Sequence, residues 1–385
     1  MRIIMLHNYY QHKGGEDQVF TAEAGLLEER GHSVKRYTLH NDLVDGMSGA
    51  SLASDTVWNR RVHHDLRALI RDVKPDVAHF HNTFPLISPA AYYAFRSEGV
   101  PVVQTLHNYR LLCLNAQFFR EGEVCEDCLG RRVPLPGVLR SCYRGERVAS
   151  AGVATMLTTH RILRTWSNVV DGYIALTRFA RDKFVEGGLP PEKIFVKPNF
   201  VERDPGMGGG GGGYVLFVGR LSREKGIETL LRAWRRLGRR ITLKIAGDGP
   251  LSGEVGRAAR ETRGIEWLGR VREREVVGLM KRAEFLVLPS LWYEGFPMVV
   301  AEAYASGLPV LASDLGSLST LVISGRTGLK FSPRSAGDLE DKAEALLDDP
   351  ALLERVRLGA REEFETHYTA DRNYTRLMEI YARVA

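Results

Sequence analysis

The 385-residue sequence lacks any apolar run near the roughly 18 residues that a membrane-spanning helix requires. Its first ten residues, MRIIMLHNYY, hold only four consecutive apolar side chains after Arg2. Such a run is too short for the core of a secretory signal peptide and is better suited to a first β-strand. We therefore expect a cytoplasmic protein.

Cysteine is also scarce, because a chain of this length with only four cysteines is no disulfide scaffold. All four lie between residues 109 and 145, in the order C-x11-C-x2-C-x13-C, at Cys113, Cys125, Cys128 and Cys142. One C-x2-C pair with two further thiols is able to hold a structural zinc ion. Buried free thiols and a redox pair are the alternatives, and a catalytic zinc is disfavoured because four thiolates leave no open position.

Positive charge is unevenly distributed along the chain, which carries 53 Lys and Arg against 47 Asp and Glu, a net charge of +6. The stretch from Arg131 to Lys183 alone has nine arginines and one lysine against three acids. A basic surface attracts phosphates, nucleic acid or an anionic membrane, although it is also typical of a solvated helical face. No interleaved aromatic pattern or nucleic-acid-binding module accompanies it, so we expect no nucleic-acid partner.

Short β-rich runs alternate with helical patterns along the whole chain, which is typical of α/β units with parallel sheets. The alternation restarts after a change in composition near residue 200, so we expect two doubly wound, Rossmann-like domains. The predicted strands cover residues 2–7, 33–39, 76–82, 101–107, 172–176, 193–198, 214–219, 242–247, 265–269, 283–289, 308–313 and 328–332.

The composition also predicts the domain boundaries. The first domain covers residues 1–200, with an insertion at 109–145 that is rich in Cys, Pro, Gly and Arg. Residues 201–213 end in six consecutive glycines, which favour a flexible linker. The second domain covers residues 214–369. Residues 370–385 form an amphipathic helix that we expect to dock back on the first domain.

The second domain has a candidate phosphate site in FVGRLSREKGIETLLRAW. Arg220 lies at the carboxyl end of a predicted strand, where ligands bind in open α/β sheets. Lys225 lies just before the next predicted helix. Two cations beside a helix N-terminus suit a diphosphate, although two surface cations on a loop are common in any α/β protein.

Glu294 and Glu302 occur in SLWYEGFPMVVAEAYASGLPV. Pro297 suits the first turn of a helix and Gly307 suits its end, so Glu294 is expected in the preceding loop and Glu302 inside the helix. This placement makes the two glutamates hydrogen-bond acceptors for different parts of one polar ligand rather than a catalytic pair. The alternative for Glu302 is a charge on the exposed side of the helix.

Together, FVGRLSREKG, AGDGP and EGFPMVVAEAYASGLPV resemble the retaining glycosyltransferases of family 4, which have the GT-B fold. Glu294 and Glu302 match the E-x7-E motif of that family. Gly14 and Gly15, the run DVAHFHN, and TLHN around His107 resemble its first-domain landmarks. The resemblance implies an α/β fold in which two Rossmann-like domains face each other across a cleft, with the last helix crossing back to the first domain.

The resemblance also implies a role for each matching residue. Arg220 and Lys225 would bind the diphosphate of a nucleotide sugar, Glu302 its ribose and Glu294 the hydroxyls of its sugar. Gly14 and Gly15 would let the first-domain loop approach the phosphates, and His107 would lie at the reaction centre as a base or a positioning group. Backbone N–H groups would assist Glu294 along the segment Gly295, Phe296, Pro297, Met298 and Val299.

The expected reaction moves a sugar from UDP-, GDP- or another nucleoside diphosphate to a hydroxyl group with retention of configuration. The chain contains no Asp-x-Asp motif, so a divalent ion at the diphosphate is not suggested and no cofactor is expected for catalysis. The acceptor is a glycan, a lipid-linked molecule or a small molecule. The basic stretch makes peripheral contact with an anionic membrane face part of this expectation.

Two other functions are compatible with such a sequence. A sugar-nucleotide epimerase or hydrolase of the same fold would need acid–base carboxylates that the sequence does not identify. A non-catalytic glycan-binding protein is disfavoured because Arg220, Lys225, Glu294 and Glu302 are all present.

Overall fold

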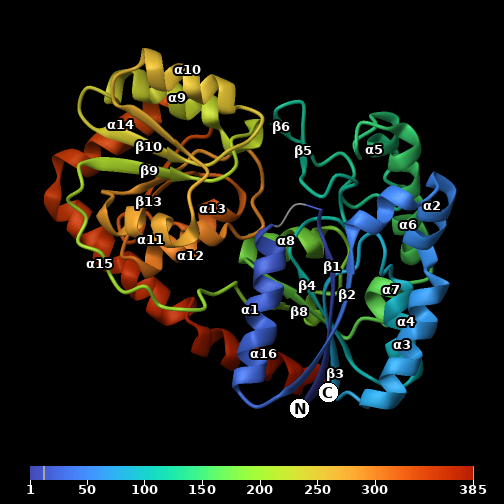
Figure 1. Cartoon of the computed structure of the whole chain (residues 1–385). Coiled ribbons are helices and arrows are strands. Elements are labelled where there is room, and N and C mark those ends of the chain that lie inside the picture. The colour runs from blue at the N-terminus through green and yellow to red at the C-terminus, as the bar shows by residue number, and fades with distance from the viewer. Residues whose placement is uncertain (12–13, 385) are drawn as a thin grey trace. The chain divides into compact units, whose positions relative to one another are not determined.

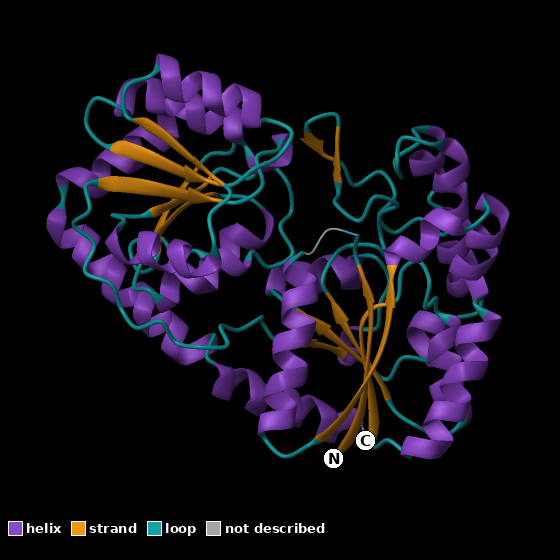
Figure 2. Ribbon diagram, viewed as in Figure 1, coloured by secondary structure: helices purple, strands orange, loops and turns teal. Residues whose placement is uncertain are grey.

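The computed structural model describes residues 1–11 and 14–384 and divides into two compact units. Unit 1 comprises Met1–Phe118, Cys125–Pro198 and the segment from Asn373 on, and unit 2 comprises Phe119–Val124 and Asn199–Arg372. In each unit a six-stranded sheet lies between layers of helices (Figure 2).

Unit 1 is built on a parallel sheet with the order β2-β1-β3-β4-β7-β8. Its strands are β1 (Arg2–Tyr9), β2 (Ser33–His40), β3 (Val77–Asn82), β4 (Val102–Leu106), β7 (Gly172–Ala175) and β8 (Ile194–Val196). Its helices are α1 (Gly15–Glu29), α2 (Gly49–Trp58), α3 (Arg60–Val73), α4 (Ala90–Ser97), α5 (Leu135–Leu139), α6 (Arg147–Ile162), α7 (Thr165–Asn168), α8 (Arg178–Glu186) and the 3₁₀ turns η1 (Asn41–Gly46) and η2 (Pro191–Lys193).

Unit 2 repeats this design with the parallel order β11-β10-β9-β12-β13-β14. Figure 1 shows α9 and α10 on one side of this sheet and α11, α12 and α13 on the other. The strands are β9 (Tyr214–Val218), β10 (Thr242–Ala246), β11 (Ile265–Gly269), β12 (Leu286–Leu288), β13 (Val310–Ser313) and β14 (Gly328–Phe331), beside the hairpin β5 (Phe119–Arg120) and β6 (Glu123–Val124). The helices are η3 (Arg223–Lys225), α9 (Ile227–Leu237), α10 (Ser252–Glu261), α11 (Glu273–Arg282), α12 (Met298–Ala305), α13 (Gly316–Leu321), α14 (Ala336–Asp348) and α15 (Pro350–His367).

All twelve predicted strands are present, and the prediction of an α/β fold with two doubly wound domains is confirmed. The reason is visible in β3, which is buried at all six positions because helices cover both faces of the sheet. Such strands need continuous apolar runs, and these runs are the signal that the sequence carries most clearly.

The last helix, α16 (Ala370–Val384), returns to unit 1, as the fold prediction stated. Figure 1 shows it beside α1 against the first sheet. Its apolar face, with Leu377 and Tyr381, joins a core that contains Ile3, Met5 and Phe20. The final position of the predicted range 370–385, Ala385, lies outside the described residues.

The glycine run, which we expected to be a flexible linker, follows the surface of unit 2. The N–H groups of Gly208 and Gly210 donate to the carbonyls of Ser306 and Lys281 at 2.9 and 3.0 Å. A Cβ atom on Gly208 would lie 2.3 Å from the Lys281 carbonyl oxygen, and one on Gly210 would lie 1.7 Å from the Arg357 guanidinium. Glycine is therefore used here for close approach of the backbone.

Candidate functional site

The loops after β9 and β12 carry one cation and one glutamate of the predicted donor site. The two strands are neighbours in the sheet, so their carboxyl ends meet at one edge. Nζ of Lys225 lies 2.8 Å from Oε1 of the buried Glu294. The hydroxyl of Ser290 donates to the same oxygen at 2.7 Å. The structure thus brings Lys225 and Glu294 together, and it adds Ser290, which the sequence analysis did not identify.

The position of Lys225 depends on the glycine that follows it. Gly226 has a left-handed backbone with φ +71, and a Cβ atom there would lie 1.8 Å from the carbonyl oxygen of Pro289. The N–H of Leu291 also donates to the carbonyl of Glu224 at 2.8 Å. These contacts hold the loop after β9 against the loop after β12, so the Lys225 ammonium lies next to the Glu294 carboxylate.

Arg220, two residues beyond the end of β9, is exposed. Its guanidinium contacts no acceptor among the residues that the structure describes. An exposed, unpaired guanidinium at the carboxyl end of a strand is available to an anionic ligand.

Helix α12 follows Glu294 and starts at Met298, with Pro297 at the position just before it. Its end has the hydrogen bonds of a Schellman motif, because the N–H groups of Gly307 and Leu308 donate to the carbonyls of Tyr304 and Ala303 at 2.9 and 2.8 Å. Gly307 has φ +63, so the predicted helix end is confirmed. The N–H of Val300 donates to the Pro297 carbonyl at 3.0 Å, so the N–H groups of Met298 and Val299 are the ones left without an intrahelical acceptor and available to anionic oxygens.

Glu302 is the fifth residue of α12 and is partly buried. Burial, with a smaller contribution from the nearby Glu273 carboxylate, raises the pKa of Glu302 to about 7. No hydrogen-bond donor among the described residues contacts its carboxylate. A partly buried acceptor without a donor is stabilised by a hydroxyl-bearing ligand.

In unit 1, His107 directly follows β4 and contacts a second histidine. Its Nε2 lies 2.9 Å from Nδ1 of His81, and the two rings are stacked with centroids 5.1 Å apart. Burial, followed by the proximity of His81, lowers the pKa of His107 well below its ordinary value. His107 is therefore neutral near pH 7, and the same shift makes it a weaker base than an ordinary histidine.

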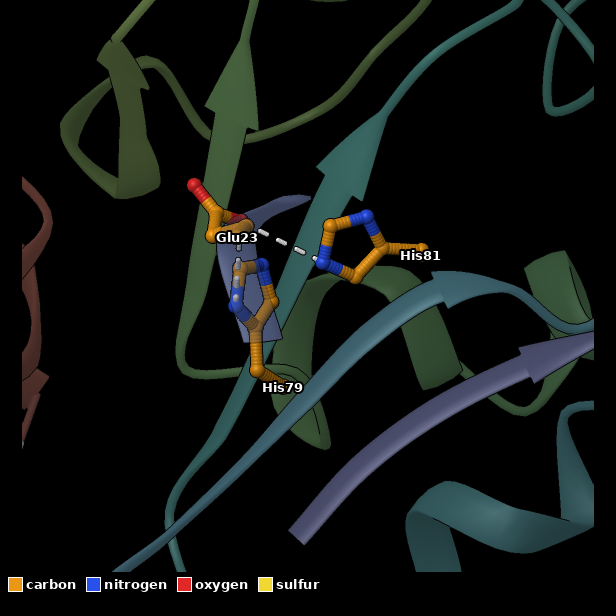
Figure 3. A group of neighbouring side chains, drawn as sticks. All are labelled: Glu23, His79 and His81. Carbon is orange, nitrogen blue, oxygen red and sulfur yellow. Dashed lines mark ion pairs between the residues drawn. The ribbon is translucent and has the colours of Figure 1, made fainter. Parts of the chain in front are cut away.

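His81 leads to Glu23 on α1, the centre of a buried polar cluster (Figure 3). Glu23 Oε2 lies 3.3 Å from Nε2 of His81 and 3.8 Å from Nδ1 of His79. Its Oε1 accepts hydrogen bonds from Lys197 Nζ at 2.6 Å and from Asn373 Nδ2 at 3.1 Å. Burial alone would raise the pKa of Glu23, but Lys197 and the two histidines hold it well below the usual range, so Glu23 is a carboxylate.

Within the described chain, Glu23, His79 and His81 form the only group of three possible metal ligands whose donor atoms lie within 4.8 Å of one another. The Lys197 ammonium already neutralises this carboxylate. Both ring nitrogens of His79 are also engaged, by the Tyr381 hydroxyl at 2.7 Å and the Thr105 hydroxyl at 2.8 Å. We therefore interpret the group as an ion-pair cluster rather than a metal site.

A pocket in unit 1 is lined by both His107 and Glu16, the second residue of α1. Glu16 accepts hydrogen bonds from the Tyr10 hydroxyl at 2.9 Å and from Asn108 Nδ2 at 3.4 Å. Burial raises the pKa of Glu16 to about 8, so this carboxyl group is largely protonated at neutral pH. The pocket thus offers a neutral imidazole and a protonated carboxyl group.

None of the four cysteines, all among the described residues, is in a disulfide. Burial raises the pKa of Cys128 to about 11, and the nearby Cys113, Cys142 and Cys125 add to the effect, so the four lie in one neighbourhood. Zinc–sulfur bonds of about 2.3 Å would require thiol sulfurs about 3.8 Å apart. Among the described residues no three of these sulfurs lie within 4.8 Å of one another, so the thiols are not arranged as a preformed zinc site.

Two family models match the chain. The model for Glycosyltransferase Family 4 matches residues 6–204, which is more than half of the chain, and the model for Glycosyl transferases group 1 matches residues 212–349. The chain belongs to Glycosyltransferase Family 4. It is therefore a glycosyltransferase, as the resemblance implied.

Curated relatives of this family 4 glycosyltransferase act on different substrates. The alpha-D-kanosaminyltransferase of Streptomyces kanamyceticus is 26% identical over 351 residues, which cover 88% of this chain and 84% of the relative. The glycogen synthase of Mycobacterium tuberculosis is 35% identical over 173 residues, but the match covers only 43% of this chain and 42% of that enzyme.

Several solved structures share the whole fold of this chain. Anabaena Alr3699/HepE in complex with UDP and glucose has a TM-score of 0.70 at 15% identity, and the match covers 100% of both chains. The sucrose-phosphate synthase of Thermosynechococcus elongatus has a TM-score of 0.71 at 16% identity, covering 99% and 98%. These likenesses support the GT-B fold of the family 4 chain.

No described helix of this glycosyltransferase is both long and apolar enough to cross a membrane.

Gly14 caps the N-terminus of α1, and its N–H donates to the Asp17 carboxylate at 2.9 Å. A Cβ atom on Gly14 would meet no atom within 4 Å, so nothing inside unit 1 requires glycine there. Gly15 is the first residue of α1.

Sequence reasoning missed Glu16, Glu23, His81 and Lys197. A signal for the histidines was present, because the fully buried strand β3 carries His79 and His81 at alternate positions. Buried polar side chains need partners, so the run VAHFHN indicates a polar contact on one face of the sheet. The identity of the partners was not accessible, because Lys197 and Asn373 lie 174 and 350 residues from Glu23.

Proposed function

We propose that this enzyme transfers a sugar from a nucleoside diphosphate to an acceptor hydroxyl with retention of the anomeric configuration. The observation that carries the proposal is the Lys225–Glu294 pair beside the open N-terminus of α12, with Glu302 five residues into that helix. Cations and free N–H groups stabilise a departing diphosphate, and carboxylates accept hydrogen bonds from sugar and ribose hydroxyls.

In the proposed donor complex, Lys225 and Arg220 bind the diphosphate, Glu302 binds the ribose and Glu294 binds the sugar. The N–H groups of the segment Gly295–Val299, in which Pro297 has none, and the loop at Gly14 and Gly15 assist. UDP is the first donor base to test, because Alr3699/HepE was solved with UDP and with UDP-glucose. The negative charge of the diphosphate is matched by side chains and helix N–H groups, so we propose that transfer requires no metal ion.

The geometry around Glu23 supports a specific protonation state for His107. The negative charge of Glu23 Oε2 favours a proton on Nε2 of neutral His81, 3.3 Å away, although these two atoms are not aligned as a hydrogen bond. His81 Nδ1 is then an acceptor, and His107 donates to it from Nε2. The remaining nitrogen, His107 Nδ1, keeps its lone pair and serves as the proton acceptor for the attacking hydroxyl group.

The proposed acceptor is a glycan, a lipid-linked molecule or a small molecule bound in unit 1 near His107. A peripheral contact with an anionic membrane belongs to the proposal, because Val133, Leu135 and Leu139 are exposed within the basic stretch. Structural zinc stays a prediction, which metal analysis of protein purified without added zinc tests. Less than a small fraction of one zinc ion per chain would reject it.

One observation favours the alternative of a sugar-nucleotide hydrolase or epimerase. Glu16 supplies the acid–base carboxyl group that the sequence analysis could not identify, in the same pocket as His107. Analysis of the products by NMR separates the two functions. Transfer yields a new glycoside of the same anomeric configuration as the donor, whereas hydrolysis or epimerisation yields a free or altered sugar without an acceptor.

The test of the donor site is a calorimetric screen of UDP, GDP, ADP and their sugars against the full chain in the presence of EDTA. We expect one nucleoside diphosphate to bind with micromolar affinity and its sugar to be consumed when an acceptor is supplied. Absence of binding by every nucleotide in the screen would reject the donor-site proposal.

A further inference from the structure

A second pocket of unit 1 is basic and is lined by residues from four parts of the chain. It has a volume of about 240 Å³, which is small for a nucleotide sugar but sufficient for one or two phosphate groups. Its polar lining comes from Arg131, Arg132, Arg161, Arg164, Trp166 and Ser167, and no carboxylate lines it.

The four arginines of this pocket, called here the arginine pocket, have no carboxylate partner among the described residues. Arg161 donates instead to three neutral backbone carbonyls, those of Arg131 at 2.6 Å, Leu111 at 2.8 Å and Arg132 at 3.3 Å. Burial lowers the pKa of Arg161, which shows that its charge is poorly compensated. A partly buried cation without a counter-charge is stabilised by an anion.

Two acids close to the lining segments in sequence are already paired with a lysine. Glu126 and Glu186 both contact the Lys183 ammonium, at 2.8 and 2.9 Å. They are therefore paired with a lysine that does not line the pocket, and the arginine pocket keeps its positive charge.

A buried donor supports the same conclusion. Trp166, which lines both this pocket and the pocket of His107, is only 6% exposed, and its indole N–H finds no acceptor among the described residues. Arg164 also has a left-handed backbone, with φ 54, although non-glycine residues rarely adopt this conformation. An unpaired N–H and a strained arginine at one pocket are expected where a ligand compensates their cost.

We propose that the arginine pocket binds a phosphate or diphosphate group. Guanidinium groups match phosphate oxygens through paired N–H donors, and the pocket offers four such groups without a competing acid. This site goes beyond the proposed function, because it belongs to unit 1 and uses none of the donor-site residues of unit 2. The phosphate comes either from a free anion or from a lipid headgroup.

The test uses the full chain with Arg220→Gln and Lys225→Gln, so that the proposed donor site does not contribute. Calorimetry with pyrophosphate is compared with and without the added pair Arg131→Gln and Arg164→Gln; Arg161 is left intact because it holds backbone carbonyls. Losing charge-assisted hydrogen bonds of about 1.5–3 kcal/mol each predicts at least about tenfold weaker binding. The control pair is Arg140→Gln and Arg147→Gln, two exposed arginines of the same basic stretch outside the pocket, and it is expected to leave binding within about twofold.

Vesicles of phosphatidate and of phosphatidylcholine identify the source of the phosphate. Binding to phosphatidate vesicles but not to free pyrophosphate, lost only with the Arg131 and Arg164 pair, assigns a lipid headgroup. Pyrophosphate binding with the same loss assigns a free anion. If the pocket pair and the control pair behave alike in both assays, or if neither ligand binds, the arginine pocket is not a phosphate site.

Discussion

At the scale of single residues, the proposed donor site of this glycosyltransferase contains groups that compensate one another when no ligand is bound. Lys225 and Glu294 form an ion pair, yet the proposed function assigns one to the phosphates and the other to the sugar. A donor must therefore replace this ion pair with contacts to both of its ends. The pair keeps both side chains in place before the donor arrives, which lowers the entropic cost of binding.

The first prediction concerns Glu294→Gln. This change frees Lys225 from its ion pair, so UDP is expected to bind as tightly as before or more tightly. Turnover of the nucleotide sugar is expected to fall about a hundredfold or more, because the sugar loses its charged acceptor. Calorimetry with UDP and a turnover assay measure the two effects. A tenfold loss of UDP affinity with normal turnover would reverse the assigned roles.

The second prediction follows from Glu302, whose pKa of about 7 lies within the working range of pH. Above pH 7 its carboxylate accepts hydrogen bonds from ribose hydroxyls, and below pH 7 protonation weakens this acceptor. We expect the affinity for a UDP-sugar to decrease by up to about tenfold between pH 8 and pH 6. In Glu302→Gln this pH dependence is expected to disappear, and an unchanged slope would exclude Glu302 from the ribose site.

At the scale of elements, the polar cluster around Glu23 connects several helices and strands of unit 1. The glutamate belongs to α1, His79 and His81 to β3, and Asn373 to α16, while Lys197 directly follows β8. The cluster thus connects α1, β3, α16 and the residue after β8, which are distant from one another in sequence. His107, which follows β4, is attached to the cluster through His81.

The third prediction tests this cluster with Lys197→Met. Removing the lysine leaves Glu23 buried without its counter-charge, which typically costs about 3–5 kcal/mol. The double variant with Glu23→Gln is expected to recover a large part of that loss, because no buried charge remains. Urea unfolding, monitored with a probe in unit 1, measures the free energy of unfolding of both variants. Equal destabilisation in the single and double variants would show that the unpaired charge of Glu23 does not cause the loss of stability.

The elements also show which parts of the structure could be predicted from the sequence. The strands were predictable because buried parallel strands require continuous apolar runs, and α12 was predictable because Pro297 and Gly307 mark its ends. The ion pair of Lys225 with Glu294 was not predicted, because each residue was assigned to a ligand and not to the other. The Glu23 cluster was not accessible either, because its members meet only after the chain has folded.

At the scale of the whole molecule, the two units differ in their buried histidines. Burial lowers the pKa values of His79, His81 and His107, all in unit 1. Below about pH 6.5 the unfolded chain binds protons at these three histidines that the folded unit does not, so their contribution to the stability of unit 1 is present above that pH and is lost as the pH falls. The raised pKa of Glu16 acts in the opposite direction, as one group against three.

The fourth prediction is a selective loss of stability in unit 1 at acidic pH. Each of these histidines is expected to contribute up to about 1.4 kcal/mol per pH unit below pH 6.5. Hydrogen exchange measured by mass spectrometry at pH 7.5 and pH 5.5, corrected for intrinsic rates, is expected to show reduced protection in β3 and β4 of unit 1. Protection in β9 and β12 of unit 2 is the internal control. Equal loss in both units would contradict the assignment to the histidines.

The central claim is that this family 4 enzyme binds a nucleoside diphosphate through Lys225, and calorimetric titration of UDP tests it most directly. The full chain is compared with Lys225→Met and with Lys244→Met, a control lysine of unit 2 that has similar exposure and its own glutamate partner. We predict at least about tenfold weaker binding for Lys225→Met and binding within about twofold for Lys244→Met, with EDTA present throughout. Equal affinity of all three proteins for UDP would contradict the account.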